Sequence, residues 1–76
     1  MNIAEQYARL EQFATYKQGW DGYNGKPIHP LAIHWARVVL FRLGPGWQPV
    51  PVSDGSVQLE WHAEGVDMEM VIEASK

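Results

Sequence analysis

The chain has 76 residues, no cysteine and a formal net charge of −3. A chain of this length forms one domain, which buries roughly 60% of the surface that the unfolded chain exposes, and no disulfide can add to its stability. Four Trp, three Tyr and two Phe supply large apolar side chains, each burying about 150 to 250 Å². We therefore expect residues 1–76 to form a single domain with an aromatic-rich core.

Charge is distributed unevenly along the chain. Residues 1–52 carry five Lys or Arg and three Asp or Glu, whereas residues 53–76 carry one and six. This pattern does not resemble the basic surface with which proteins displace counterions from nucleic acids, so direct nucleic-acid binding is not expected. No apolar run reaches the roughly 18 residues of a membrane span, and no signal peptide precedes the first predicted helix. We expect a cytoplasmic protein that does not bind membranes.

The first predicted element is a helix that begins after Asn2. The Asn2 side chain can cap the helix while Glu5 bonds back to the cap backbone. Gly19 is the expected end, because glycine is common just past a helix. Apolar residues recur at helical spacing and predict the inward face, which consists of Ile3, Tyr7, Leu10 and Ala14 with Phe13 and Lys17 at its edge.

The segment from residue 19 to residue 30 is rich in Gly, Asp, Asn and Pro, which predicts turns. Trp20, Asp21 and Tyr23 lie within it. Two exposed aromatic rings beside a carboxylate would suit stacking on a sugar or a base. The structural alternative is that Trp20 and Tyr23 anchor the loop, with Trp20 closing one end of the core.

A second helix is predicted from Pro30 to Gly44. Proline suits the first helical position because its φ is fixed, and Gly44-Pro45 ends the helix. The apolar residues cover a far wider arc than the roughly 100° stripe of an ordinary surface helix. We therefore expect this helix to be sandwiched between other elements, with Phe41 left in solvent on the polar side beside Arg37.

Residues 57–74 alternate between apolar and polar side chains on both sides of Glu64-Gly65, which predicts an antiparallel hairpin closed by a two-residue turn. In that register the apolar residues oppose one another and form one buried face. Residues 48–52 contain two prolines and are at best a short edge strand. The predicted fold is α+β, with two helices packed on one face of a small three-stranded antiparallel sheet in the order ααβββ.

The other face of the predicted hairpin is acidic. The same register places Glu60 directly opposite Glu69, at a cost of a few tenths of a kcal/mol, and Asp67 and Glu73 share this face. It also places His62 opposite Asp67, where we expect a surface ion pair worth roughly 0 to 1 kcal/mol. One interpretation is a solvated face whose charges prevent pairing with other sheets. The other is an array of like charges that attracts and binds a basic partner surface. Both interpretations stay open at this point.

Three stretches together resemble a group of short, mostly uncharacterised bacterial and phage-associated proteins. They are Gly19-Trp20-Asp21-Gly22-Tyr23 with Lys26-Pro27, the proline-started helix, and Asp54-Gly55 followed by Leu59-Glu60-Trp61. The resemblance extends over residues 10–73. It implies no activity, catalytic residue or cofactor, but it implies a mobile-element context, in which small proteins often act by binding something larger.

Catalytic and metal-binding chemistry find little support in the sequence. Ser53 and Ser56 flank a turn, and no local spacing places a histidine and an orienting acid beside either hydroxyl. The facing Glu60 and Glu69 could raise each other's pKa, but on an open sheet rather than in a cleft. A divalent ion would be held only loosely by Glu60, His62, Asp67 and Glu69. We predict no enzyme, no catalytic residue, no cofactor and no metal site.

The predicted function is that of a non-enzymatic protein-binding module. The larger partner, a protein or complex with a basic surface, would contact either the Arg37 and Phe41 side of the second helix or the acidic sheet face of Glu60, Asp67, Glu69 and Glu73. With the resemblance, a concrete version is a phage or mobile-element inhibitor of a bacterial defence or nucleic-acid-handling complex, similar to an anti-CRISPR protein, in the host cytoplasm.

Two alternatives accompany this prediction. The first is a small-molecule or sugar binder that uses Trp20, Asp21 and Tyr23. The second is a structural protein that forms homo-oligomers through the wide apolar arc of the second helix.

Overall fold

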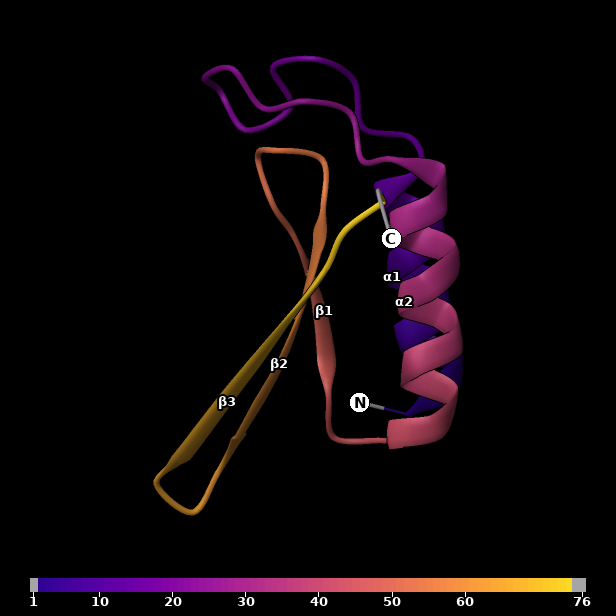
Figure 1. The fold of residues 1–76 in the computed structure, drawn as a ribbon, viewed down its shortest axis with the longest axis vertical. Helices are drawn as coiled ribbons and strands as arrows, with labels where there is room; N and C mark the ends of the chain where they lie inside the picture. The colour runs from indigo at the N-terminus through magenta and orange to yellow at the C-terminus, as the bar shows by residue number, and fades with distance from the viewer. Residues whose placement is uncertain (1, 75–76) are drawn as a thin grey trace.

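The computed structural model describes residues 2–74. Its elements are α1 (Ile3–Phe13), α2 (Pro30–Leu43), β1 (Gln48–Pro51), β2 (Val57–Ala63) and β3 (Val66–Ile72). The strands form one antiparallel sheet in the order β1-β2-β3, and the two helices lie side by side on one side of it (Figure 1). The predicted α+β fold in the order ααβββ, with a short first strand at an edge, is confirmed.

Helix α1 begins as predicted. The Asn2 side chain accepts a hydrogen bond from the backbone N–H of Glu5 at 2.8 Å, and the Glu5 carboxylate accepts one from the Asn2 N–H at 3.2 Å. The predicted end at Gly19 was wrong, because α1 stops at Phe13. After Phe13 the backbone hydrogen bonds join residues three apart, from Thr15 to Gln12 and from Tyr16 to Phe13. The Thr15 hydroxyl also donates to the carbonyl of Gln12 at 2.7 Å, as Ser and Thr often do where a helix ends in a turn.

The inward face of α1 also differs from the prediction. Its buried side chains are Gln6, Leu10 and Phe13, whereas Ile3 and Ala14 are exposed. The buried face of α1 is therefore rotated toward Gln6, a polar residue that the spacing of apolar residues could not identify.

Helix α2 has the predicted bounds, and its first turn is capped by His29, whose Nδ1 accepts from the backbone N–H of Leu31 at 3.1 Å. The expectation that α2 is sandwiched was wrong. Only one side is buried, through Ala32, Ile33, Ala36 and Leu40, and more than a third of the surface is exposed at Leu31, Trp35, Val38, Phe41 and Leu43. The helix is covered by α1 and by the near end of the sheet but not by the rest of the hairpin.

The hairpin has the predicted register, with Glu60 paired to Glu69 and Trp61 to Met68. Its turn residues Glu64 and Gly65 have φ values of 52° and 77°. Positive φ at both positions defines a type I′ turn, whose twist matches that of the strands.

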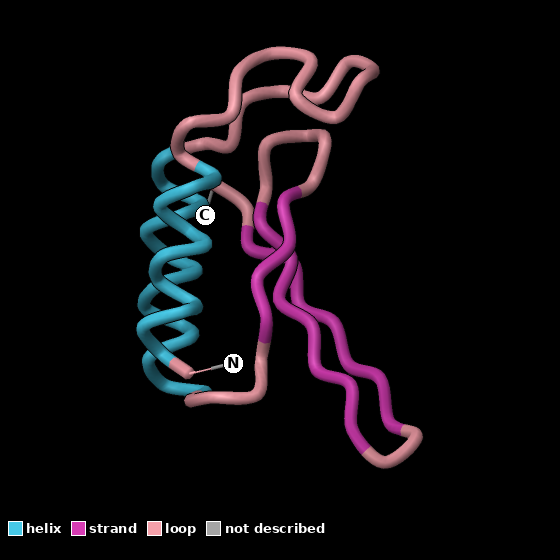
Figure 2. The backbone as a smooth tube through the Cα atoms, turned by 180° about the vertical axis from the view of Figure 1, so that it is seen from behind, coloured by secondary structure: helices cyan, strands magenta, loops and turns pink. Residues whose placement is uncertain are grey.

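The core lies between the helices and the part of the sheet nearest to them. Its fully buried sheet residues are Val57 and Leu59, which pack with Leu10, Phe13, Ile28, Ala32, Ile33, Ala36 and Leu40. The far half of the hairpin extends away from the helices (Figure 2). The predicted burial of the hairpin's apolar face is therefore correct only for its near half. Neither helix within residues 2–74 has the length and apolar character needed to cross a membrane.

Candidate protein-binding surfaces

The far half of the hairpin, called the projecting half below, carries an apolar face. Alternation along the strands and the observed register place Trp61, Val66, Met68 and Met70 on the same side of the sheet. The ring of Trp47, in the segment that follows α2, lies 5.8 Å from the Trp61 ring. We call these five side chains the apolar face.

Trp61 is held against the backbone that precedes β1. Gly46 has a φ of 107°, and a Cβ atom at this position would lie 2.5 Å from Cζ3 of Trp61. Glycine is therefore required here both for the backbone conformation and for the close approach of the ring. This contact fixes the start of the projecting half relative to the α2–β1 connection.

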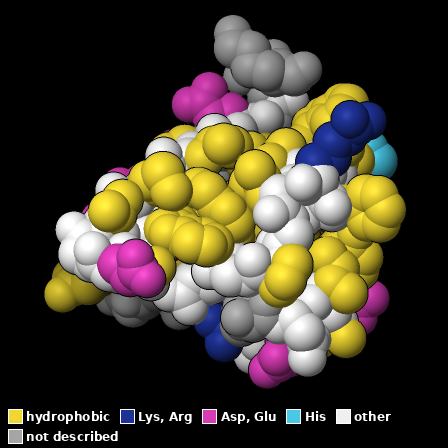
Figure 3. Space-filling view, turned by 90° about the horizontal axis from the view of Figure 1, so that it is seen from below, with side chains coloured by type: hydrophobic (Ala, Val, Ile, Leu, Met, Phe, Trp, Pro, Cys, Tyr) yellow, Lys and Arg dark blue, Asp and Glu magenta, His cyan; other side chains and the backbone are white. Residues whose placement is uncertain are grey.

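The outer part of the apolar face is open to solvent. Val66, Met68 and Met70 are 51%, 44% and 38% exposed. Hydrophobic side chains gather on the side of the molecule seen from below, with acidic side chains at their margin (Figure 3). Contiguous apolar surface bordered by charge is typical of protein–protein contact sites.

The opposite side of the hairpin is the predicted acidic face, and His62 divides it. The His62 ring contacts the Asp67 carboxylate through Nδ1 at 2.7 Å and the Glu60 carboxylate through Nε2 at 3.2 Å. The hydrogen bond to Asp67, followed by that to Glu60, raises the pKa of His62 above its usual value. No hydrogen bond or ion pair within residues 2–74 involves the carboxylates of Glu69 and Glu73. The acidic face therefore combines two carboxylates that contact His62 with two that make no such contact within residues 2–74.

The His62 cluster gives the first testable prediction. Because the pKa of His62 is raised in the folded state, its contribution to stability is complete below the pKa of an unfolded histidine and is lost as pH rises through the folded-state value. Asp67→Asn should lower the pKa of His62, since it removes the largest cause of the shift. Imidazole ¹⁵N shifts followed by NMR across pH would measure this. A pKa that does not change in the variant would contradict the bridging geometry.

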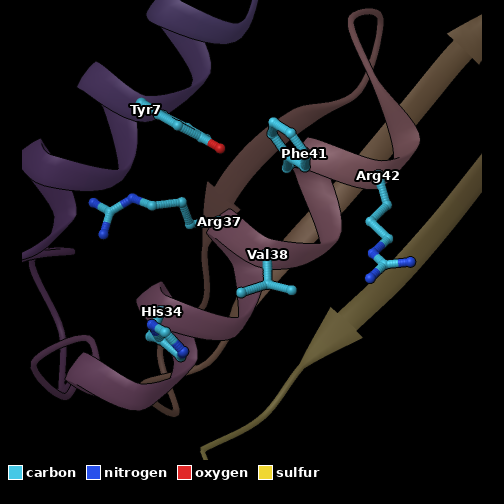
Figure 4. A pocket seen from close by; sticks show the side chains of 6 residues that line it. All are labelled: Tyr7, His34, Arg37, Val38, Phe41 and Arg42. Atoms are coloured by element: carbon cyan, nitrogen blue, oxygen red, sulfur yellow. The ribbon is translucent and has the colours of Figure 1, made fainter.

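The predicted contact residues of α2 meet on a different surface. Arg37 and Phe41 line an open depression of about 560 Å³ together with Tyr7, His34, Val38 and Arg42. The Arg37 guanidinium lies over the Tyr7 ring at 5.5 Å, a cation–π geometry. Figure 4 shows Arg37 extending toward α1, whereas Arg42 extends away from Arg37. As predicted, Phe41 is strongly exposed, at 73%.

The predicted ligand platform is largely committed to holding its own loop. The Trp20 indole N–H donates to the carbonyl of Lys26 at 2.7 Å, and its ring stacks on Tyr16 at 5.2 Å. The Asp21 carboxylate accepts from the backbone N–H groups of Tyr23 and Gly25 at 3.0 and 2.9 Å. The Tyr23 side chain is 85% exposed, so its expected role as an anchor was wrong. Trp20 and Asp21 therefore have structural roles within this loop.

One depression contains a serine, an acid and a histidine, which the sequence did not indicate. Ser56, Asp54 and His29 all line it. The Ser56 hydroxyl donates to the Asp54 carboxylate at 2.6 Å rather than to the His29 ring, and hydrogen bonds from Ser56 lower the pKa of Asp54. Nδ1 of His29 is occupied as the α2 cap. This arrangement stabilises the turn and lacks the nucleophile–base contact of a catalytic triad. Residues 2–74 contain no cluster of three or more His, Asp or Glu suited to holding a metal.

Gln6 is the residue that sequence reasoning missed. It is fully buried, and its Nε2 donates to the carbonyls of Trp47 at 2.7 Å and Gly44 at 3.2 Å. Gln6 therefore ties α1 to the segment that carries Trp47 and so positions one end of the apolar face. Its Oε1 has no partner within residues 2–74. A single glutamine in a helix has no local pattern that could have predicted this role.

Comparisons with known proteins do not assign the chain to a family. The sequence matches no protein-family model, and no similar chain was found among curated proteins or solved structures. The functional argument therefore depends on the surfaces described above.

Proposed function

We propose that this chain is a non-catalytic protein-binding module that uses the projecting half of its hairpin. The observation that carries the proposal is the exposed apolar face at Val66, Met68 and Met70. A small domain that leaves this much apolar surface in solvent gains stability when a partner covers it.

Charge defines the class of partner. Asp67 and Glu69 in β3, and Glu73 just after it, lie on the opposite side of the hairpin from the apolar face, so both features meet at the β3 edge. Glu69 and Glu73 have no cation paired with them within residues 2–74. A partner protein with an apolar segment flanked by Lys or Arg matches both features. Charge attraction accelerates encounter, and apolar burial supplies most of the affinity. The basic depression at Arg37 and Phe41 is a second contact surface for an extended partner.

The resemblance adds a biological setting to this proposal. We propose that the partner belongs to a bacterial defence or nucleic-acid-handling complex and that binding inhibits it in the host cytoplasm. The acidic residues would then occupy a basic surface that otherwise holds nucleic acid.

Affinity capture with matched variants tests the proposed function. The chain would be immobilised and exposed to bacterial lysate at low and high salt, and the retained proteins identified by mass spectrometry. Met68→Asp places a charge in the centre of the apolar face and should reduce retention of the partner at least about tenfold, because desolvating one charge costs more than 1.4 kcal/mol. Tyr23→Asp introduces the same charge at an exposed residue of the α1–α2 connection, outside the apolar face, and should have no effect.

The outcomes separate the proposal from its alternatives. If Met68→Asp retains the same proteins as the unmodified chain at both salt concentrations, the apolar face is not a binding surface. If Tyr23→Asp alone abolishes retention, the turn platform is the binding site. Light scattering on the unmodified chain would detect homo-oligomers.

A further inference from the structure

The two edges of the sheet differ in chemistry. β1 is a four-residue strand with two prolines, and α1 packs against it. β3 has seven residues and no proline, and every position except Ile72 is exposed. An edge strand of this kind presents unpaired backbone donors and acceptors to any extended chain.

The direction in which each backbone group points follows from the hydrogen-bond pattern. The Val52 N–H donates to the Ser56 carbonyl at 3.0 Å, which continues the β1–β2 pairing. Because inward and outward positions alternate in an antiparallel pair, Val50 also faces β2, whereas Pro49 and Pro51 turn their nitrogen atoms outward. The two outward positions of β1 are thus the ones that lack an N–H, and Pro49 is also buried. The β1 edge is closed to further pairing.

The same reasoning shows that the β3 edge is open. In a hairpin closed by a type I′ turn, the residues that flank the turn, Ala63 and Val66, exchange both hydrogen bonds. Met68, Met70 and Ile72 therefore also face β2, and the backbone groups of Asp67, Glu69 and Val71 point outward. No hydrogen bond outside the sheet involves these outward backbone groups within residues 2–74.

A second copy of this chain is a poor occupant of the edge. An antiparallel pair of β3 strands must align the two apolar faces. In every register that keeps the apolar faces aligned and pairs the middle of the two strands, at least one acidic residue opposes another acidic residue. The opposed residues come from Asp67, Glu69 and Glu73, and they are either two different acids or the same acid from each copy. Like charges directly opposite each other are destabilising. Glu60 is paired with Glu69 in the adjacent strand β2 and adds to the repulsion between the acidic residues of the two copies.

We propose that the β3 edge accepts an extended segment of a partner protein in which apolar side chains alternate with Lys or Arg. This inference rests on the proposed function and specifies the partner's recognition element. Paired with β3, the segment would hydrogen-bond to the backbone of Asp67, Glu69 and Val71. Its basic side chains would lie on the side of Asp67 and Glu69, and its apolar side chains would extend the surface formed by Met68 and Met70. Strand addition of this kind draws affinity from the backbone and specificity from alternate side chains.

Synthetic peptides provide the test. The probe is acetyl-Lys-Val-Lys-Val-Lys-Val-Lys-amide, and ¹⁵N-labelled protein reports binding by NMR. We expect the peptide to protect the amides of Asp67, Glu69 and Val71 from hydrogen exchange. A peptide with Glu in place of Lys should bind at least about tenfold more weakly because of charge repulsion. The Lys peptide with alternate backbone nitrogens methylated should also bind at least about tenfold more weakly, because several hydrogen bonds are lost at once.

A variant of the protein tests the edge directly. Val71→Pro removes one outward N–H without changing charge or the bonds to β2, and so copies the chemistry of the β1 edge. It should weaken binding of the Lys peptide by about three- to tenfold, the contribution of one hydrogen bond. Val71→Ala is the matched control, because it shortens the same side chain and keeps the N–H. Unchanged β2 amide shifts would show that the hairpin is intact.

The results distinguish this inference from the proposed function. If the methylated and unmethylated peptides bind equally, or if the outward amides of β3 gain no protection, edge pairing is wrong. If in that case Met68→Asp still abolishes partner capture, the partner contacts the apolar face by another mode. If Met68→Asp also has no effect, the hairpin is not the binding surface and both proposals fail.

Discussion

Leu59→Ala is expected to lower the free energy of unfolding by about 2 to 5 kcal/mol, the usual cost of a buried Leu→Ala change. Leu59 is 0% exposed, and it belongs to the single core cluster that joins the near half of the sheet to both helices. A chain of 76 residues has a total stability of only about 4 to 11 kcal/mol. This one substitution should therefore remove a large share of the total stability, and at the lower end of this range it would leave a substantial unfolded population at physiological temperature.

Met70→Ala is the matched control for this prediction. Met70 pairs with Leu59 in the hairpin and lies on the same face, but it is 38% exposed. Its truncation should cost about 1 to 2 kcal/mol, less than that of Leu59, because part of its surface stays in water on folding and its removal leaves no enclosed cavity. Urea unfolding followed by tryptophan fluorescence would measure both. Equal losses for the two variants would mean that the helices cover more of the hairpin than described here.

Gln6→Glu is the second substitution with a large expected effect. At neutral pH it would place a carboxylate against the carbonyl oxygens of Trp47 and Gly44, where the amide now donates. A buried charge without a partner costs about 3 to 5 kcal/mol. We expect the variant to be largely unfolded at neutral pH under conditions in which the unmodified chain is folded.

The pH dependence of this effect has a definite sign. Burial against two acceptors would raise the pKa of the introduced carboxyl group in the folded state. The destabilisation is then greatest at neutral pH and diminishes as pH falls through the raised pKa, because the protonated acid is neutral and can donate to a carbonyl. Thermal unfolding at several pH values would follow this recovery. Gln12→Glu, at an exposed position of the same helix, should have little effect at any pH.

Local signals in the sequence predicted much of the fold. Asn2 and Glu5 form the expected capping box, and Pro30 starts the second helix. The Glu64-Gly65 turn sets the expected register. Each of these features depends on residues close together in the chain, so propensity and spacing were sufficient to find it.

The errors involved contacts between distant segments. Gln6 is buried because the end of α2 and the segment before β1 present carbonyl groups to it, 38 and 41 residues away in the chain. The hairpin's apolar pattern was read as one buried face, but alternation cannot show how far the helices extend along it. Met68 and Met70 therefore remain exposed although they fit the pattern of a core strand. This uncovered part is the candidate binding surface.

The register predicted two features of the acidic face correctly, Glu60 opposite Glu69 and the contact between His62 and Asp67. The second contact of the His62 ring, with Glu60 in its own strand, depends on side-chain orientations that alternation does not specify. The binding residues predicted on α2, Arg37 and Phe41, do lie together in one depression. Of the three residues predicted as a ligand platform, Trp20 and Asp21 make hydrogen bonds within their own loop, which fits the structural alternative for these two residues.

The prolines of β1 have a consequence for stoichiometry. Because Pro49 and Pro51 occupy the outward positions of one edge, a strand can join this sheet on one flank only. Any assembly built by strand addition must end after a single step, since the product offers no second flank on this chain for growth. If the proposed strand addition takes place, we expect closed one-to-one complexes rather than the repeated strand stacking that leads to fibrils.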